Sequence, residues 1–309
     1  MSQFLSTRDG FGQGLYELVK DHKDIMVLTA DLAESTRVSA IAKDFPDQFI
    51  DCGVSEQNMM GIAAGLAQEG LVPFVNSFAV FNPGRNWDQL RVSVCYSNLP
   101  VKIIGHHCGF SSGEDGATHQ AFEDLAITRC LPNLSIIQPC DYHEAQSCVE
   151  EIYKQKSPVY VRVGKYEPDP VIIKNNSFEF GKAQVLTEGT RLTLISSGFF
   201  TRICLDIAQA IGDIETIKIS TIKPLDEETI LNSVKKTGRV VVVEDHQIVG
   251  GLGSAITELL SEKLPTSVLR LGMNDQFGRS GSINELLNYY QLDYTSLKQK
   301  IAKFTKGII

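Results

Sequence analysis

The chain has no excess of positive charge, no long apolar run and no paired-cysteine motif, and each absence excludes a class of protein. Its 37 acidic and 29 basic residues give a net charge of −8. This argues against nucleic-acid and anionic-membrane partners, because both bind basic surfaces. The apolar run Val240–Val243 is far shorter than the roughly 20 residues that cross a bilayer. We therefore expect no nucleic acid and no membrane among the partners.

The cysteines and the N-terminus point to a reduced, cytoplasmic compartment. The seven cysteines are an odd set without a CxxC pair, so they are expected to be free thiols. No basic segment followed by an apolar segment opens the chain, as a secretory signal would require. Neither His143 nor His246 has a second ligand at metal spacing, so the sequence predicts no metal site.

A length of 309 residues favours two domains rather than one core. In the first half, short β-branched runs alternate with helical periods, which indicates a parallel sheet covered by helices. The predicted strands there are Ile25–Thr29, Phe49–Cys52, Val72–Val75, Val101–Gly105, Ser135–Gln138 and Val159–Val163. Residues 166–190 are polar and turn-rich, and a second alternating series follows. We predict an α/β protein with a first domain at 1–165, a linker at 166–190 and a second domain at 191–309.

The stretch from Gly113 to Arg129 concentrates ionisable and small residues after a predicted strand. The carboxyl ends of parallel strands are where open α/β sheets bind ligands. His119 stands just before Phe122 and Leu125, whose spacing predicts the start of a helix. The sequence thus places an imidazole beside the unpaired N–H groups of a helix N-terminus.

A second motif, Asp51–Ala67, reads as a strand end followed by a helix. Ser55 is expected to cap that helix, which makes Glu56 a carboxylate of its first turn. Two interpretations remain open for Glu56. It can simply complement the helix dipole, worth about 0.3–1 kcal/mol. Alternatively, it is a partly buried carboxylate that shares a proton with a heterocyclic nitrogen.

Aromatic and cationic side chains supply further candidates. Phe78 and Phe81 are three residues apart, so their rings share one face of a turn; they are either ordinary core or a platform for a flat ligand. Four scattered groups have the donors that suit an anion such as phosphate. They are Arg8, Ser35, His107 and Arg162. Each alone is an ordinary surface group, and their significance depends on whether they converge.

Four motifs resemble motifs in the C-terminal half of transketolase, and they occur along the chain in the same order as in that family. Gly113–Gln120 (GEDGATHQ) resembles that family's GEDGPTHQ, and Gly53–Gln57 (GVSEQ) resembles its GV(R/S)E(H/Q). Ser77–Phe81 (SFAVF) resembles TFxxF, and Ala30–Ser35 (ADLAES) resembles ADLxxS. The similarity runs across nearly the whole chain. The departures are Ala117 in place of proline and no third aromatic after the SFAVF motif.

The resemblance implies a pyrimidine-binding domain, a transketolase C-terminal domain and thiamine diphosphate as cofactor. It implies that Glu56 bonds N1′ of the cofactor's aminopyrimidine, that Phe78 and Phe81 pack against this ring, and that Asp31 supports the pocket. His119 is implied as catalytic and, with Asp115, as a contact to the sugar. The resemblance also implies that the four anion-binding candidates all bind the phosphate of the substrate. They are Arg8, Ser35, His107 and Arg162.

One family motif is missing: the GDG sequence, followed some tens of residues later by Asn, that holds Mg²⁺ and the cofactor's diphosphate. The resemblance therefore implies the C-terminal subunit of a split transketolase of the pentose phosphate type. Its partner would be an N-terminal diphosphate-binding subunit that supplies most of the Mg²⁺ site, in a two-plus-two heterotetramer. It would transfer a two-carbon ketol unit between sugar phosphates, from a ketose to an aldose.

Three alternatives remain. Two are other thiamine-diphosphate enzyme subunits, of the 2-oxoacid dehydrogenase beta type or the deoxyxylulose-phosphate synthase type. The third is a non-catalytic binding module that kept the fold.

Overall fold

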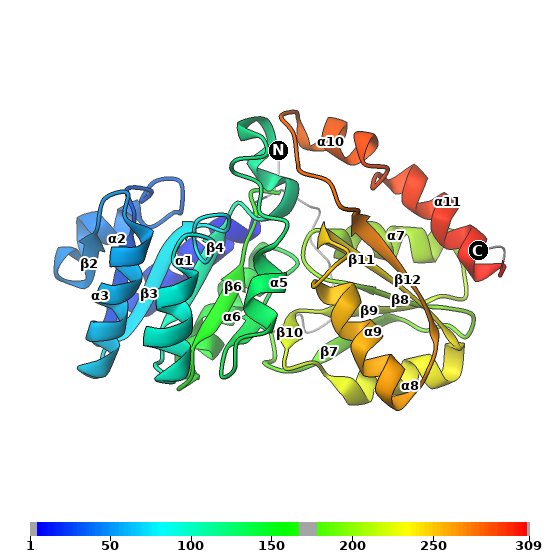
Figure 1. The fold of residues 1–309 in the computed structure, drawn as a ribbon, viewed down its shortest axis with the longest axis horizontal. Helices are drawn as coiled ribbons and strands as arrows, with labels where there is room; N and C mark the ends of the chain where they lie inside the picture. The colour runs from blue at the N-terminus through cyan, green and yellow to red at the C-terminus, as the bar shows by residue number, and fades with distance from the viewer. Residues whose placement is uncertain (1–4, 167–177, 308–309) are drawn as a thin grey trace.

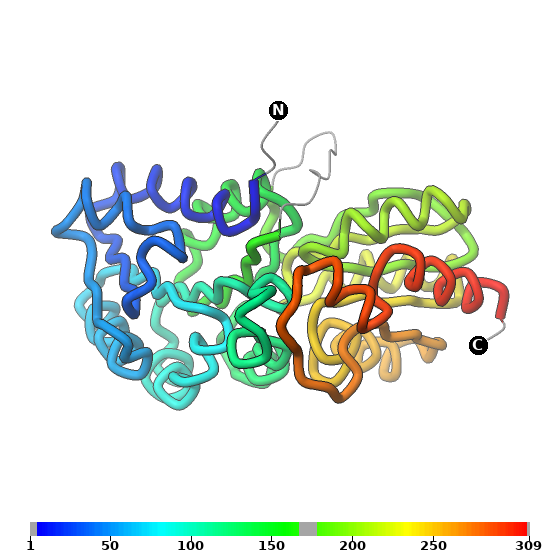
Figure 2. The backbone as a smooth tube through the Cα atoms, turned by 90° about the horizontal axis from the view of Figure 1, so that it is seen from above, coloured from blue at the N-terminus to red at the C-terminus, as the bar shows by residue number. Residues whose placement is uncertain are grey.

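The structure, a computed structural model, describes residues 5–166 and 178–307. These residues form two β-sheets that lie next to each other, each flanked by helices (Figure 1). The view from above shows the same two lobes, with the N-terminal helix along the upper edge of the first (Figure 2). The predicted α/β architecture of two mainly parallel sheets is confirmed.

The first sheet has seven strands in the order β10-β5-β6-β4-β3-β1-β2 within the described residues. All neighbours pair in parallel except β10 with β5. The strands are β1 (Ile25–Thr29), β2 (Phe49–Asp51), β3 (Val72–Phe78), β4 (Lys102–His106), β5 (Ser135–Ile137), β6 (Val159–Arg162) and β10 (Thr221–Lys223). The central strands β3 and β4 are buried along their whole length, so their carboxyl ends are held in rigid structure.

Helices on both faces cover this sheet. They are α1 (Thr7–Asp21), α2 (Ser39–Asp44), α3 (Glu56–Gln68), α4 (Trp87–Gln89), α5 (Asp124–Arg129) and α6 (Tyr142–Lys154). A capping box starts α1: Ser6 Oγ accepts from the Asp9 N–H, and the Asp9 carboxylate accepts from the Ser6 N–H. A segment of 3-10 turns, Gly109–Asp115, follows β4.

The second sheet has the order β12-β11-β8-β9-β7 in the described part of the chain. Its strands are β7 (Ala183–Thr187), β8 (Thr193–Ser196), β9 (Glu215–Ile219), β11 (Arg239–Gln247) and β12 (Ser267–Met273). Its helices are α7 (Phe200–Ile211), α8 (Glu227–Thr237), α9 (Leu252–Lys263), α10 (Ile283–Tyr289) and α11 (Tyr294–Thr305). Strand β7 pairs antiparallel with β9, and the other neighbours pair in parallel.

The predicted linker is partly folded. Strand β7 lies inside the stretch 166–190 and forms the edge of the second sheet, although its surroundings are polar and turn-rich. Residues 167–177 of that stretch lie outside the described residues. An edge strand is half-exposed, so its sequence lacks the continuous apolar run by which the buried strands were predicted.

Strand β10 joins the two halves of the molecule. It comes after β9 of the second sheet in sequence but pairs with β5 of the first, with Thr221 opposite Ile137. Nearby, Lys218 Nζ lies 2.6 Å from Glu144 Oε1, and both side chains are buried. The sequence did not predict this connection, which fixes the two domains against each other.

No helix in the described part of the chain has the length and apolar character needed to cross a bilayer.

Candidate functional site

Four rings gather at the carboxyl ends of β3 and β4. Phe78 ends β3, and Phe81 lies in the turn that follows; their rings are nearly parallel, with centroids 6.1 Å apart. The His119 ring meets Phe81 edge-on at 5.4 Å. The His107 ring, one residue beyond β4, lies 4.0 Å from Phe78. The structure therefore brings together two phenylalanines and two histidines from three separate segments.

Glu56 belongs to the same cluster. It is the first residue of α3, and its side chain is only 5% exposed. Arg85 Nη1 lies 3.1 and 3.2 Å from the two carboxylate oxygens, and the Arg85 guanidinium carbon lies 3.9 Å from the centroid of the Phe81 ring. The carboxylate and the aromatic pair are thus linked through one arginine.

The sequence did not single out Arg85. A lone arginine in a turn carries no signal by itself; its position four residues after Phe81 is the feature that places it over that ring. The expected cap of α3 is also wrong in detail, because Ser55 Oγ donates to the Cys52 carbonyl at 2.8 Å rather than accepting from the helix.

Arg8 and its neighbours, here called the cationic corner, adjoin the four rings. Arg8 Nη1 lies 3.3 Å from His107 Nε2 and donates to the Ser35 carbonyl at 3.2 Å. The Arg8 backbone N–H donates to the Gly164 carbonyl at 3.1 Å, which brings the exposed Lys165 to this corner. Burial, and then the charges of Arg8 and Lys165, lower the pKa of His107 to about 3. His107 is therefore a neutral imidazole that accepts from Arg8 through Nε2.

Loop contacts, rather than a helix, hold His119. Helix α5 begins at Asp124, so the prediction that His119 stands at a helix N-terminus is wrong. The His119 N–H donates to the Gly116 carbonyl at 3.0 Å, and Ser112 Oγ donates to the His119 carbonyl at 2.6 Å. The apolar spacing after His119 reflects a short helix that starts later, because residues 116–123 form a turn and a bend, with Ala121 bridged to Cys108.

The second domain secures the loop that carries Asp115 and His119. Gln120 Nε2 donates to the Gly113 carbonyl at 3.2 Å and to the Arg279 carbonyl at 3.0 Å. A Cβ atom on Gly278 would lie 1.7 Å from Gln120 Oε1, so a side chain at this position would displace the Gln120 amide. Both views show the segment before α10 next to this loop (Figures 1 and 2). Asp115, at the end of the 3-10 segment, is left exposed.

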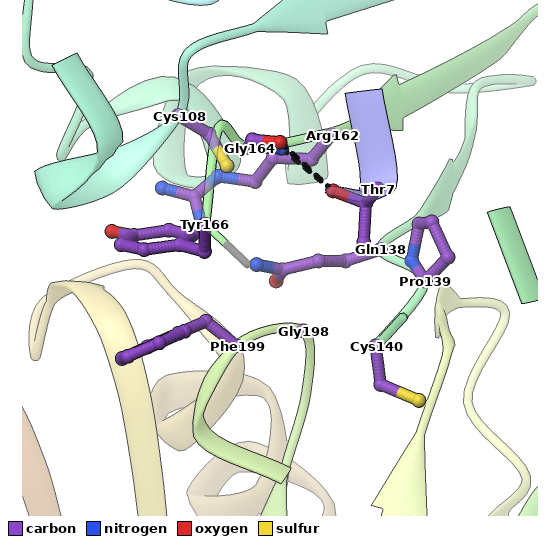
Figure 3. Close-up of a pocket in the computed structure, with 10 residues that line it drawn as sticks. All are labelled: Thr7, Cys108, Gln138, Pro139, Cys140, Arg162, Gly164, Tyr166, Gly198 and Phe199. Atoms are coloured by element: carbon purple, nitrogen blue, oxygen red, sulfur yellow. Dashed lines mark hydrogen bonds between the residues drawn. The ribbon is translucent and has the colours of Figure 1, made fainter. Parts of the chain in front are cut away.

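Arg162 is not brought to the cationic corner. Its fully buried guanidinium forms ion pairs with Asp124, at 2.7 Å, and with Asp245, and it donates to the Ala121 carbonyl at 3.0 Å. It borders a cavity of about 10 Å³ between the two domains, with Tyr166 to one side (Figure 3). The two aspartates neutralise the charge of Arg162. Beyond the end of β6, Lys165 is therefore the cation that acts on the cationic corner.

Asp31 lies at the carboxyl end of β1 with an exposed side chain. Its backbone adopts φ 60°, and its N–H donates to the Asp51 carboxylate at 2.9 Å. It stands at the same edge of the sheet as Phe78, two strands from β4. Within the described residues, no cluster of three His, Cys, Asp or Glu residues is arranged to hold a metal ion.

Two buried histidines are expected to destabilise the protein on acidification below about pH 6.5, whereas Glu244, whose pKa burial raises to about 7, acts in the opposite direction. An unfolded histidine titrates near pH 6.5, whereas burial lowers the pKa of folded His107 to about 3 and that of His246 to about 4. Between about pH 6.5 and these lowered pKa values, the two histidines bind protons in the unfolded chain but not in the folded chain. The contribution of each histidine to the free energy of unfolding therefore falls as the pH decreases, by up to about 1.4 kcal/mol per pH unit.

Urea unfolding at pH 7.5 and pH 5.5 measures the effect. His107→Asn should shrink the difference between the two pH values, whereas a substitution at the exposed His143 should leave it unchanged. An equal pH difference in both variants contradicts the assignment to His107.

Two family models match this chain. The model described as "Transketolase, pyrimidine binding domain" matches residues 3–168, and that described as "Transketolase, C-terminal domain" matches residues 181–297. The chain belongs to the transketolase family. It corresponds to the C-terminal section of a transketolase, as the resemblance of its motifs implied.

Individual transketolase relatives match this chain over nearly its whole length. A protein of Methanocaldococcus jannaschii assigned as a transketolase C-terminal section is 43% identical over 97% of this chain and 96% of its own length. One subunit of the apulose-4-phosphate transketolase of Phocaeicola vulgatus is 35% identical over 99% of both chains. Human transketolase is 34% identical over 99% of this chain but only 49% of its own length.

Among solved structures, a split-gene transketolase in the form of an inactive β4 tetramer superposes with a TM-score of 0.88. It is 38% identical, and the match covers 97% of this chain and 99% of that one. The chain is therefore similar in its whole extent to transketolase subunits that are encoded separately, and to about half of the human enzyme.

Proposed function

We propose that this chain is the C-terminal subunit of a split transketolase that binds thiamine diphosphate at the interface with a separate N-terminal subunit. The complex transfers a two-carbon ketol unit from a ketose phosphate to an aldose phosphate. The single observation that carries the proposal is the nearly buried Glu56 carboxylate, linked through Arg85 to the Phe78–Phe81 pair with His119 at its edge.

The groups in the cluster fit an aminopyrimidine. The planar guanidinium of Arg85 stacks on Phe81 and donates to Glu56. A flat ring with a protonated nitrogen would find the same two partners, an aromatic face and a carboxylate. Glu56 would hold the proton shared with N1′, and Phe78 and Phe81 would pack on the ring. The cofactor supplies the electron sink when bound. Asp31 would support the wall of this pocket.

The cationic corner suits the phosphate of a sugar. Arg8 provides charge-assisted donors, Lys165 provides a second positive charge, and the segment that carries Ser35 closes the corner. His107 is neutral there, so it can donate a hydrogen bond through Nδ1, a buried nitrogen for which no partner is found among the described residues. His119 and Asp115, on the loop that Gln120 secures, would meet the reacting end of the sugar and move protons there.

Two relatives support a separate partner subunit. The chain spans about half of human transketolase, and the given sequence contains no GDG motif. In this proposal a separate N-terminal subunit supplies the diphosphate and Mg²⁺ ligands. The relative from Phocaeicola vulgatus is itself one subunit of its enzyme, and the solved split-gene chain forms a β4 tetramer. We infer a two-plus-two heterotetramer with an N-terminal subunit.

Mixing the purified chain with its N-terminal subunit, thiamine diphosphate and Mg²⁺ tests the proposal. Ketol transfer from xylulose 5-phosphate to ribose 5-phosphate is expected only from the mixture, and the isolated chain should stay at the background rate because it lacks half of the site. Full turnover by the isolated chain contradicts the split arrangement. Activity with pyruvate and glyceraldehyde 3-phosphate, but not with two sugars, assigns the deoxyxylulose-phosphate synthase reaction instead.

A further inference from the structure

Arg85 makes the contacts that a ligand of the cluster would need. Its Nη1 atom reaches both oxygens of Glu56, at 3.1 and 3.2 Å, and its guanidinium lies 3.9 Å from the centroid of the Phe81 ring. The Glu56 side chain is 5% exposed, whereas the Arg85 side chain is 50% exposed. The arginine therefore covers the carboxylate from the solvent side.

A flat heterocycle with N–H groups in its plane would make the same kinds of contact as this guanidinium. A guanidinium is planar, stacks on aromatic faces and donates N–H groups in its plane. An aminopyrimidine held by a carboxylate and a phenylalanine would use the same carboxylate oxygens and the same kind of ring contact. The two cannot both occupy the position that Arg85 fills now.

We propose that Arg85 is an internal competitor of the cofactor: its side chain occupies the pyrimidine position in the isolated chain and must leave before thiamine diphosphate binds. This inference rests on the proposed function. Arg85 thereby weakens cofactor binding and covers Glu56 until the cofactor displaces it. It is not a catalytic residue, because it departs before the chemistry begins.

The surroundings of Arg85 allow its side chain to move while its backbone stays in place. The Arg85 N–H donates to the Phe81 carbonyl at 2.9 Å, and Gln57 Nε2 donates to the Arg85 carbonyl at 3.2 Å. A Cβ atom on the preceding Gly84 would lie 2.0 Å from the Val80 carbonyl oxygen, so this turn is tightly packed. Arg85 is half-exposed, so its guanidinium is readily rehydrated when it leaves, and the aminopyrimidine takes over the contact to the nearly buried Glu56 carboxylate.

The alternative role is that of a positioning residue. If Arg85 stayed on Glu56 in the complex and oriented the carboxylate, its removal would weaken cofactor binding. The two roles predict changes of opposite sign in the same measurement.

Isothermal titration calorimetry of the two-chain complex with thiamine diphosphate and Mg²⁺ measures the sign. Arg85→Ala and Arg85→Gln should lower the Kd of thiamine diphosphate about three- to tenfold, because the competing ion pair and cation–π contact are each weak. Arg85→Lys, which keeps the charge but lacks the flat face, should give a smaller decrease. Arg91→Ala is the matched control, because Arg91 is equally exposed and pairs with Asp88 on the neighbouring helical segment.

The outcomes separate this inference from the proposed function. An unchanged or higher Kd in both Arg85→Ala and Arg85→Gln, with thermal midpoints equal to wild type, overturns the inference and leaves the proposed function standing. A wild-type complex that binds no thiamine diphosphate overturns the proposed function and this inference with it. A decrease in Kd confined to the Arg85 variants supports both.

Discussion

Glu56→Gln is expected to lower the kcat of the reconstituted enzyme by about 100- to 10,000-fold, the usual range for loss of a positioned proton-transfer group. Glutamine keeps the size of the side chain and can still accept a hydrogen bond, but it cannot hold an exchangeable proton at the position of Glu56. Because Glu56 is nearly buried at the start of α3, bulk water cannot readily replace it in this role. Initial rates of ketol transfer at saturating cofactor measure the effect.

Glu69→Gln provides a matched control at the other end of the same helix. Glu69 is exposed and follows the last residue of α3, so its substitution should leave the rate within about twofold of wild type. The thermal midpoints of both variants should equal that of wild type. A Glu56→Gln enzyme with a normal rate at saturating cofactor would refute the proton role of Glu56.

Arg162→Met is expected to destabilise the chain by about 3–5 kcal/mol, the range found when one partner of a buried ion pair is removed. The substitution leaves Asp124 and Asp245 buried without their cation. Tyr160 donates to Asp124 at 2.7 Å and Gln138 donates to Asp245 at 3.1 Å, but neither contact neutralises a charge. Urea unfolding measures the loss, and a marginally stable domain would lose much of its stability.

The same variant separates a structural role of Arg162 from a role in substrate binding. A structural role predicts a lower urea midpoint, whereas phosphate binding predicts a higher KM at unchanged stability. Arg202→Met is the control, since Arg202 pairs with Asp206 on the surface of α7, where an ion pair contributes about 0–1 kcal/mol. A stable Arg162→Met chain with a raised KM would return Arg162 to the phosphate site.

The sequence predicted the regular elements well where they are buried. The run Ile25–Thr29 is a strand with the predicted bounds, and Val72–Val75 is a strand that continues to Phe78. Buried parallel strands have continuous apolar runs, which is a local signal. The edge strand β7 and the short β10 lack such a run, because the contacts that stabilise them come from strands elsewhere in the chain.

The candidate site was predicted only in part. Motifs brought Glu56, Phe78, Phe81 and His119 to notice, and the structure places them in one cluster. The pairing of Arg8 with His107 joins residues 99 positions apart, which no local pattern encodes. The role of Arg85 likewise depends on the approach of a turn to a helix start 29 residues earlier.

The sequence by itself determined the class of fold, the absence of an apolar span and the family, because strand and helix periodicity and ordered motifs are carried by neighbouring residues. Tertiary structure alone decided which charges meet. Arg162, a strand-end arginine like many others, is buried between Asp124 and Asp245, while the charge of the exposed Lys165 acts on His107. The free energy of a charge depends on its burial and on partners within a few ångströms, and only the folded chain sets those distances.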